Sequence, residues 1–286
     1  MNYQCCVLCP RVCGVDRTEE QGYCRMPAGA RVAKVMRHFW EEPVLAGEGG
    51  SGAIFFSGCT LGCLYCQNDA ISRGFGGENM DAAALRKTME GLITQGVENI
   101  DLVTPTHFLP DIVPALSPKL PVPVVYNCGG YERVETLERL DGLVDIYLPD
   151  LKYADDVLAH QLSGARDYFQ VAAAAIREMV RQTGPYVLEG EKLKRGVLIR
   201  HLILPGQVEN SLRVLDWIGE TFAKGAVLVS LMRQYTPMPR VMGLPRLDRQ
   251  VTQEEFEAVL SWMYLNKLEG FIQEPQSAGR EYIPDF

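Results

Sequence analysis

The sequence lacks a run of apolar residues close to the ~20 that a helix needs to cross a bilayer. Its first residues, Met-Asn-Tyr-Gln-Cys-Cys, contain no basic segment followed by an apolar core, so we expect no signal peptide. Together these absences predict a cytoplasmic protein with no membrane partner, in a compartment where thiols stay reduced. Internal repeats and low-complexity segments are absent as well.

Basic charge is scarce in this chain. The 286 residues include 28 Lys and Arg against 36 Asp and Glu, a formal net charge of −8. This balance argues against a nucleic-acid partner, because binding to nucleic acid usually needs a basic surface. Basic residues gather at 192–200 and 233–249. We expect these to be solvated surface, and the alternative is a rim that faces an acidic peptide or substrate.

The nine cysteines do not fit a disulfide framework. Their number is odd, and eight of them precede residue 67. In a reducing compartment such clustering indicates metal or redox chemistry.

The chain from about residue 50 onward has the pattern of an α/β protein. Continuous apolar runs of this kind are typical of parallel strands that are buried on both faces. With helices between them, six such units predict a β/α barrel or partial barrel, whose chemistry gathers on loops at the carboxyl ends of the strands. The expected strands are Ala53–Ser57, Ile100–Thr104, Val122–Asn127, Val144–Leu148, Val197–Ile203 and Val227–Leu231.

Helices are expected between these runs. Asp81 can cap a helix that continues to about Gln95, and Thr252 begins a capping box for a helix through Lys267. The other expected helices are Glu132–Leu140, Tyr168–Gln182 before Gly184-Pro185, and one capped by Asn210 or Ser211 that ends near Ala223.

A cysteine motif follows the first expected strand. Cys59, Cys63 and Cys66 form C-x3-C-x2-C, and Gly58 and Gly62 allow the backbone to wrap around a metal centre. Three ligands leave one position open, as in an iron–sulfur cluster with one free iron, whereas a structural zinc normally has four. The alternatives are unliganded thiols, or a zinc site completed by His38, His107 or Cys128.

A second cysteine group lies in the turn-rich N-terminus. Cys6, Cys9, Cys13 and Cys24 suffice for zinc or for a second Fe–S cluster, and Cys5 is a spare thiol. Because this segment has little apolar periodicity, a bound metal would supply stability that packing does not. We therefore expect a cysteine-rich metal-binding module at 1–48 and a barrel domain at 49–286.

The Cys59–Cys66 segment resembles the motif of the radical S-adenosylmethionine (SAM) superfamily, C-x3-C-x-aromatic-C, with Tyr65 at the aromatic position. The following Gln67-Asn68 is similar to the sequence found in the branch of pyruvate formate-lyase activating enzyme. In this chain an N-terminal cysteine module precedes the motif. The resemblance spans roughly residues 50 to 275 and implies a partial (β/α)6 barrel. It also implies a 4Fe–4S cluster whose open iron chelates SAM. Reductive cleavage of SAM then gives a 5′-deoxyadenosyl radical, which abstracts hydrogen from a substrate.

The same resemblance assigns site residues. Asp150 and Lys152 match an Asp-x-Lys element near SAM and the substrate peptide, and are the catalytic candidates. The second strand lacks the Gly-Gly-Glu turn that binds the SAM amino group, and Thr104 and Thr106 offer hydroxyl acceptors there. His107 is either a proton-transfer group or an ordinary loop histidine. The remaining cofactor-binding candidates are Tyr65 beside the adenine, Asn127 near the ribose, Arg200 facing into the barrel with His201 facing away, and Gln234 and Tyr235 at the adenine.

Three functions follow from this pattern. The first is an activating enzyme that receives electrons from a donor such as flavodoxin or ferredoxin and makes a glycyl radical in a partner protein. The second is a radical SAM enzyme that modifies another peptide or a small molecule, which the missing Gly-Gly-Glu supports. The third is a non-catalytic Fe–S or redox-sensing protein.

Overall fold

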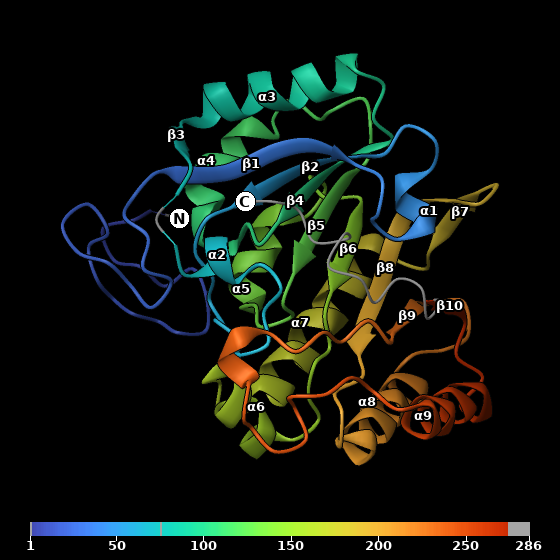
Figure 1. Cartoon of the computed structure of the whole chain (residues 1–286). Coiled ribbons are helices and arrows are strands. Elements are labelled where there is room, and N and C mark those ends of the chain that lie inside the picture. Colours follow the sequence, from blue (N-terminus) through green and yellow to red (C-terminus); the bar gives the residue numbers. More distant parts are fainter. Residues whose placement is uncertain (1, 75, 274–286) are drawn as a thin grey trace.

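Six parallel strands form the centre of the fold. The computed structural model describes residues 2–74 and 76–273, and shows a sheet with the order β10-β9-β8-β6-β5-β4-β2-β1-β3 (Figure 1). Each of the six expected runs is a parallel strand of this sheet, which confirms the α/β class and the partial barrel. These strands are β2 (Ser51–Phe56), β4 (Asn99–Val103), β5 (Val124–Cys128), β6 (Ile146–Pro149), β8 (Lys192–Leu202) and β9 (Leu228–Met232).

Four strands that the sequence analysis missed extend the sheet. β1 (Ala30–His38) pairs antiparallel with β2, and β3 (Glu78–Met80) pairs with β1. β7 (Val187–Glu189) pairs with β8, and β10 (Gly270–Ile272) continues the parallel sheet beside β9. β1 lies within the expected N-terminal module yet belongs to the sheet. The division at residue 48 stays a prediction, and residues 274–286 lie outside the described part of the chain.

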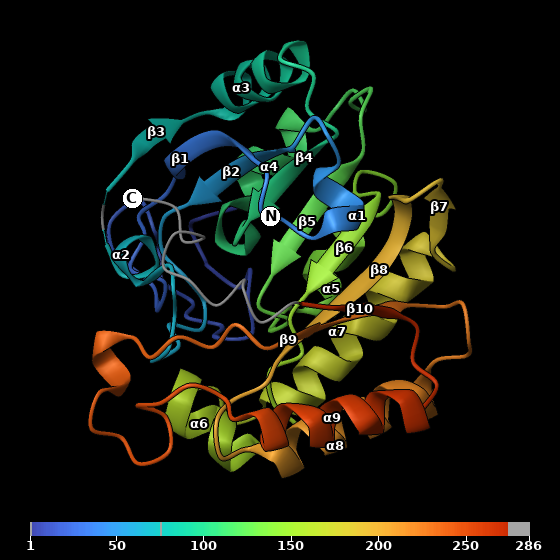
Figure 2. The same ribbon diagram turned by 45° about the vertical axis from the view of Figure 1, so that its right-hand side comes forward.

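The helices cover the outer face of the curved sheet (Figures 1 and 2). α3 (Ala82–Thr94) packs against β2 and β4, and Asp81 caps it as expected. α7 (Tyr168–Thr183) packs against β6 and β8, and the capping box at Thr252 opens α9 (Gln253–Leu265). The shorter helices are α1 (Pro43–Ala46), α2 (Asp69–Ser72), α4 (Leu109–Ala115), α5 (Val134–Leu137) and α6 (Asp156–Ser163), with 3-10 turns at Thr106–Phe108, Glu138–Leu140 and Pro239–Val241.

The expected start of one helix is wrong. α8 spans Val208–Thr221, so Asn210 and Ser211 lie inside it and do not cap it. Both side chains are buried and bonded to other elements. Asn210 accepts from the amide of Ala154, and Ser211 bonds the ring of His201. Cap-type residues therefore serve tertiary contacts here.

No helix in the described ranges is long and apolar enough to span a membrane. The expected cytoplasmic location stays a prediction.

Arg17 joins the N-terminal segment to the barrel. Its side chain is fully buried, and its guanidinium donates to the carbonyl oxygens of Met26, Pro27 and His107. The first two carbonyls belong to the N-terminal segment, and the third follows β4. A charged donor shared among three carbonyls therefore fixes this segment, which has few regular backbone ladders of its own.

Replacing Arg17 with Met should loosen the N-terminal segment and lower the stability of the whole chain. Each buried carbonyl left without a donor costs about 1–3 kcal/mol, so we expect a loss of roughly 3 kcal/mol or more. Denaturant unfolding measures that loss, and limited proteolysis should show new cleavage before residue 30. Arg139→Ala, at an exposed arginine, is the control. An Arg17 variant with unchanged unfolding and cleavage would contradict this account.

Candidate functional site

The three cysteines of the motif line one large cavity. β2 ends at Phe56, and the following loop brings Cys59, Cys63 and Cys66 to a cavity of about 1040 Å³. Gly58 has φ +79°, and a Cβ there would lie 2.7 Å from the carbonyl oxygen of Cys24. The loop therefore needs glycine at this position, both for its backbone conformation and for its contact with the N-terminal segment.

The thiols of this loop are close enough to influence one another. Burial raises the pKa of Cys66 to about 12, and the neighbouring thiols of Cys63 and Cys59 add to the rise. Burial likewise raises the pKa of Cys59, again with a contribution from Cys63. Such thiols become thiolates only if a cationic centre compensates them, and iron does so. The donor set therefore fits a cluster held by three cysteines with one iron open to the cavity.

A chain of hydroxyl groups supports Cys63. The Ser163 hydroxyl donates to Cys63 Sγ at 2.9 Å, and lies 2.7 Å from the hydroxyl of Tyr153. The Tyr153 hydroxyl in turn lies 2.6 Å from that of Tyr65. Hydrogen bonds to ligating sulfur tune the potential of iron–sulfur clusters. Nothing in the sequence pointed to Ser163, which α6 supplies from 100 residues away.

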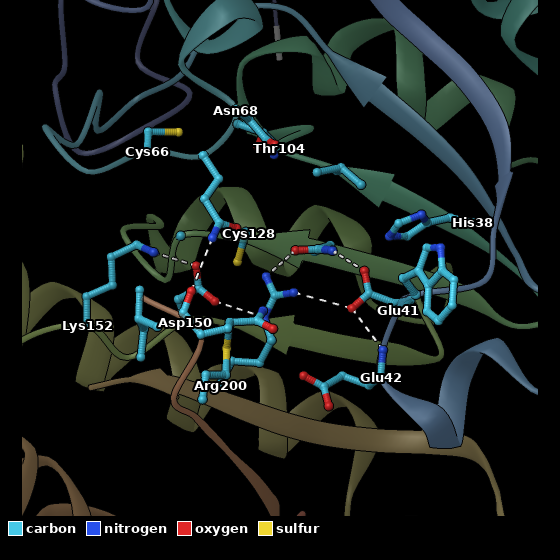
Figure 3. A pocket seen from close by; sticks show the side chains of 18 of the residues that line it. His38, Glu41, Glu42, Cys66, Asn68, Thr104, Cys128, Asp150, Lys152 and Arg200 are labelled. Carbon is cyan, nitrogen blue, oxygen red and sulfur yellow. Dashed lines mark hydrogen bonds and ion pairs between the residues drawn. The ribbon is translucent and has the colours of Figure 1, made fainter. Parts of the chain in front are cut away.

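Charged side chains continue the cavity from the cysteine loop into the barrel (Figure 3). Lys152 Nζ lies 2.6 Å from Asp150, whose other oxygen accepts from Arg200 at 2.9 Å. Burial alone would raise the pKa of Asp150, but Arg200 and Lys152 hold it below its usual value. Arg200 also donates to Asn127 at 2.6 Å. The structure thus brings together four of the expected residues, from β5, β6 and β8.

The far side of Arg200 is acidic. Glu41, in the loop between β1 and α1, lies 3.4 Å from the guanidinium and accepts from the Asn127 amide at 3.2 Å. Glu42 also lines the cavity, and accepts from the Ser230 hydroxyl at 2.8 Å. Neither glutamate was among the expected site residues, because nothing in the local sequence places this loop inside the barrel.

Thr104 and Thr106 line the cavity after β4, together with Glu132. Thr104 has φ +60°, which strains a non-glycine residue. The Thr106 hydroxyl donates to Glu132 at 2.8 Å, and the Tyr126 hydroxyl donates to the other oxygen at 3.2 Å. Burial raises the pKa of Glu132 to about 7, against the opposing effect of these bonds. The sequence analysis missed Glu132, although Gly129-Gly130-Tyr131-Glu132 contains the elements of a Gly-Gly-Glu turn one strand further on.

Of the three residues expected at the adenine, two line the cavity and one lies behind the lining. Gln234 and Tyr65 line the cavity. Tyr235 is buried outside the lining, donates to the carbonyl oxygen of Leu247, and has its ring centroid 6.1 Å from that of Tyr65. It is thus placed to support Tyr65 from behind.

Two histidines have structural partners. The ring of His107 is buried and bonded to the carbonyl oxygen of Ser57, and burial lowers its pKa to about 3. His201 faces away from the cavity, as expected, and bonds Leu151 and Ser211. The ordinary loop or core role therefore describes His107 better than proton transfer does.

The N-terminal cysteines gather beside the barrel. Burial raises the pKa of Cys9 to about 12, with contributions from Glu132, Cys24 and Cys13, and the pKa of Cys24 is raised with a contribution from Cys6. Over residues 2–74 and 76–273, no three or more His, Cys, Asp or Glu side chains are arranged to hold a single metal ion. The structure thus does not form the zinc site completed by His38, His107 or Cys128. A four-iron cluster is larger than one ion and holds its thiolates farther apart.

Residues 45–107 match the family model of a 4Fe-4S single cluster domain. The chain is also 29% identical over 265 residues to the uncharacterized protein MJ0674 of Methanocaldococcus jannaschii, a match that covers 89% of this chain and 73% of that protein.

Several solved structures have a similar fold. A radical SAM methyltransferase from Sphaerobacter thermophilus has a TM-score of 0.55 at 14% identity, covering 87% of this chain and 78% of that one. Methylornithine synthase (PylB) has a TM-score of 0.53 at 16% identity, covering 78% and 70%. SuiB of Streptococcus suis, bound to its precursor peptide SuiA, has a TM-score of 0.53 at 14% identity and 76% coverage of this chain. The chain spans about half the length of SuiB, 46%. With its matching 4Fe-4S segment, the chain has the fold of the radical SAM enzymes.

Proposed function

We propose that this chain is a radical SAM enzyme, with a 4Fe–4S cluster on Cys59, Cys63 and Cys66 and SAM in the adjoining cavity. The observation that carries the proposal is the position of the three thiols on one loop, at the end of a cavity that continues to Asp150 and Arg200. A redox sensor needs the thiols but gives no reason for a cavity of about 1040 Å³ beside them.

The cluster and SAM, when bound, supply reductive cleavage of the sulfonium and hydrogen abstraction from the substrate. The protein's residues hold and orient the reactants. Lys152 is fixed on Asp150, so its ammonium is presented to the cavity in one position. The Arg200 guanidinium donates to oxygen atoms of Asp150, Asn127 and Glu41, which makes it a rigid positive group in the cavity wall. Tyr65 and Gln234 offer a ring and an amide for the adenine.

For the SAM amino group, Glu132 takes the place of the missing glutamate. It lies beside Thr106 at the end of β4, where the resemblance expects that group, and lines the cavity with a carboxyl group whose two oxygens accept from hydroxyl donors. Its burial without a basic partner among these bonds favours a ligand that brings the positive charge.

The finer proposal is that the substrate is a peptide or protein, with a glycyl radical enzyme as the first candidate. The Asp150-x-Lys152 element supports this, as does its likeness to the activating-enzyme branch. We also infer that Cys6, Cys9, Cys13 and Cys24 hold a second Fe–S cluster, because the four thiols gather in a segment with little regular secondary structure. A single zinc ion fits less well, since no three of the described side chains are arranged for one ion.

Cys59→Ala should abolish formation of 5′-deoxyadenosine, because two thiolates cannot hold the cluster in place. The chain is reconstituted anaerobically with iron and sulfide, reduced with dithionite and given SAM, and the product is measured by chromatography. Cys5→Ala, at an exposed thiol, should keep the activity. Full turnover by Cys59→Ala would refute the cluster assignment, and iron binding without product in the wild type would favour the redox-sensing function.

Glu132→Gln should weaken SAM binding by about tenfold or more, because an ion-assisted hydrogen bond contributes about 1.5–3 kcal/mol. Equilibrium dialysis of labelled SAM against the reconstituted chain measures the affinity, and the iron content should equal that of the wild type. Glu138→Gln alters an exposed carboxylate of the same region and is the control. Equal SAM affinity in Glu132→Gln would remove this residue from the SAM site.

A glycyl radical should appear in a captured partner if the finer proposal holds. The reconstituted chain is incubated with SAM, reductant and partners captured from lysate, and frozen for EPR spectroscopy. A glycyl doublet that depends on SAM, and that is lost with Cys59→Ala, is the expected result. Cleavage of SAM without that doublet would favour another peptide or a small molecule.

A further inference from the structure

The acidic end of the cavity has more negative charge than its neighbours balance. Asp150, Glu41, Glu42 and Asp101 lie near the single guanidinium of Arg200, and against the effect of burial their charges raise its pKa. Among the described residues that line the cavity, the lysine and arginine side chains are those of two residues, Lys152 and Arg200. Lys152 forms an ion pair with Asp150. Arg200 is therefore shared between Asp150 and the other three carboxylates.

Two of these carboxylates have oxygen atoms without a donor. Glu42 is 3% exposed and lines the cavity, and its Oε1 accepts from Ser230 while its Oε2 has no partner. Asp101 is fully buried in β4 behind the lining, and its Oδ2 accepts from Asn127 while its Oδ1 has no partner. Buried acceptors of this kind are costly unless a donor reaches them.

The titrating groups near this end do not supply the missing cation. Burial lowers the pKa of His38, against the opposing effect of Glu41, and so disfavours a charged imidazole here. Burial raises the pKa of Glu42 to about 7, and Glu41 adds to the rise. The pKa of Asp101 is also raised by burial and by Glu41. A cationic group entering here would return these carboxylates to their charged form.

Aromatic side chains border the same end. Trp40 and Phe39, which directly precede the two glutamates, line the cavity and are 66% and 49% exposed, and Phe271 of β10 lines it as well. Figure 3 shows the Glu41 carboxylate at the end of the cavity away from Cys66. Aromatic faces attract ammonium groups, and they also give an entering alkyl chain an apolar surface.

We propose that Glu41 and Glu42, with the carboxylate of Asp101 behind them, form a binding site for an alkylammonium group of the substrate, carried by a lysine side chain of a peptide or by a free amine. A primary ammonium has three donors, which suits the unpartnered oxygen of Glu42 and the shared carboxylate of Glu41 in the cavity wall. Asp101 adds its charge from behind the lining. A bare metal ion does not fit, since no set of three such side chains in the described ranges is arranged for one. The assignment of this group to the substrate rests on the proposed function, whereas its binding does not.

The test is a binding measurement on the reconstituted full chain without reductant. Calorimetry compares n-pentylammonium with its neutral and anionic analogues, pentan-1-ol and pentanoate. A parallel measurement uses two five-residue peptides that differ only at the central position, which is lysine in one and norleucine in the other. We expect at least one ammonium probe to bind about tenfold or more tightly than its uncharged analogue. The tighter of the two ammonium probes identifies the source, free amine or lysine side chain.

Glu42→Gln and Asp101→Asn should each reduce that preference about tenfold, because both keep the shape and remove the charge. Glu90→Gln, at an exposed glutamate of α3, should leave it unchanged. If Asp101→Asn fails to fold, Glu42→Gln decides alone. Equal binding of charged and uncharged probes, or a preference that survives Glu42→Gln, would overturn the proposal.

SAM is itself cationic, so the probe is also titrated in the presence of saturating SAM. Unchanged binding of the ammonium probe supports a separate substrate site, and displacement by SAM would overturn it. Failure of the proposed function has a different signature. In that case the wild type forms no 5′-deoxyadenosine, whatever the ammonium probe does.

Discussion

The guanidinium of Arg200 holds the interior of this barrel together. It lies on β8, donates to Asp150 after β6 and to Asn127 on β5, and reaches Glu41 in the loop after β1. Asp150 and Arg200 also form a parallel β-bridge, so the backbone pairing of β6 and β8 continues to the level of the ion pair. Because these strands are parallel, their polar ends meet at one level, and the charged group and the cysteine loop share one cavity.

Buried charge of this kind is costly to assemble, since each ion loses its hydration. Asp150 recovers much of that cost, as its lowered pKa indicates, through two cations. Glu42, Asp101 and Glu132 do not, and burial raises the pKa of each. The barrel thus has one compensated charge group in its middle and uncompensated carboxylates on either side. Uncompensated buried carboxylates are typical of functional sites, where a bound ligand can supply the missing positive charge.

The N-terminal segment is part of the same assembly. Arg17 bonds it to the carbonyl oxygen of His107, and Gly58 of the cysteine loop packs on the backbone of Cys24. Arg11 donates to Thr60 in the cysteine loop and to Ser163, whose hydroxyl bonds Cys63. The N-terminal segment and the cysteine loop are therefore joined by direct contacts.

Local sequence determined a large part of this protein. The six parallel strands follow from continuous apolar runs, and the caps at Asp81 and Thr252 from residues within one turn of each other. The cysteine motif is likewise local, since three thiols within eight residues must share a loop. Asp150 and Lys152 could be assigned by their resemblance to an Asp-x-Lys element that follows an expected strand, and Arg200 by the inward position that the resemblance implies within another.

Tertiary structure decided what surrounds these residues. Glu41 and Glu42 enter the barrel because β1 pairs antiparallel with β2, and its mixed pattern of buried and half-exposed residues gave no strand signal. Asn210 and Ser211 serve tertiary partners inside α8, against their tendency to cap. Glu132 and Ser163 reach the site from loops and helices whose separation along the chain is unrelated to their distance in space. Sequence periodicity fixes which residues face inward, but only packing fixes which of them meet, because contact energies between distant segments have no local pattern.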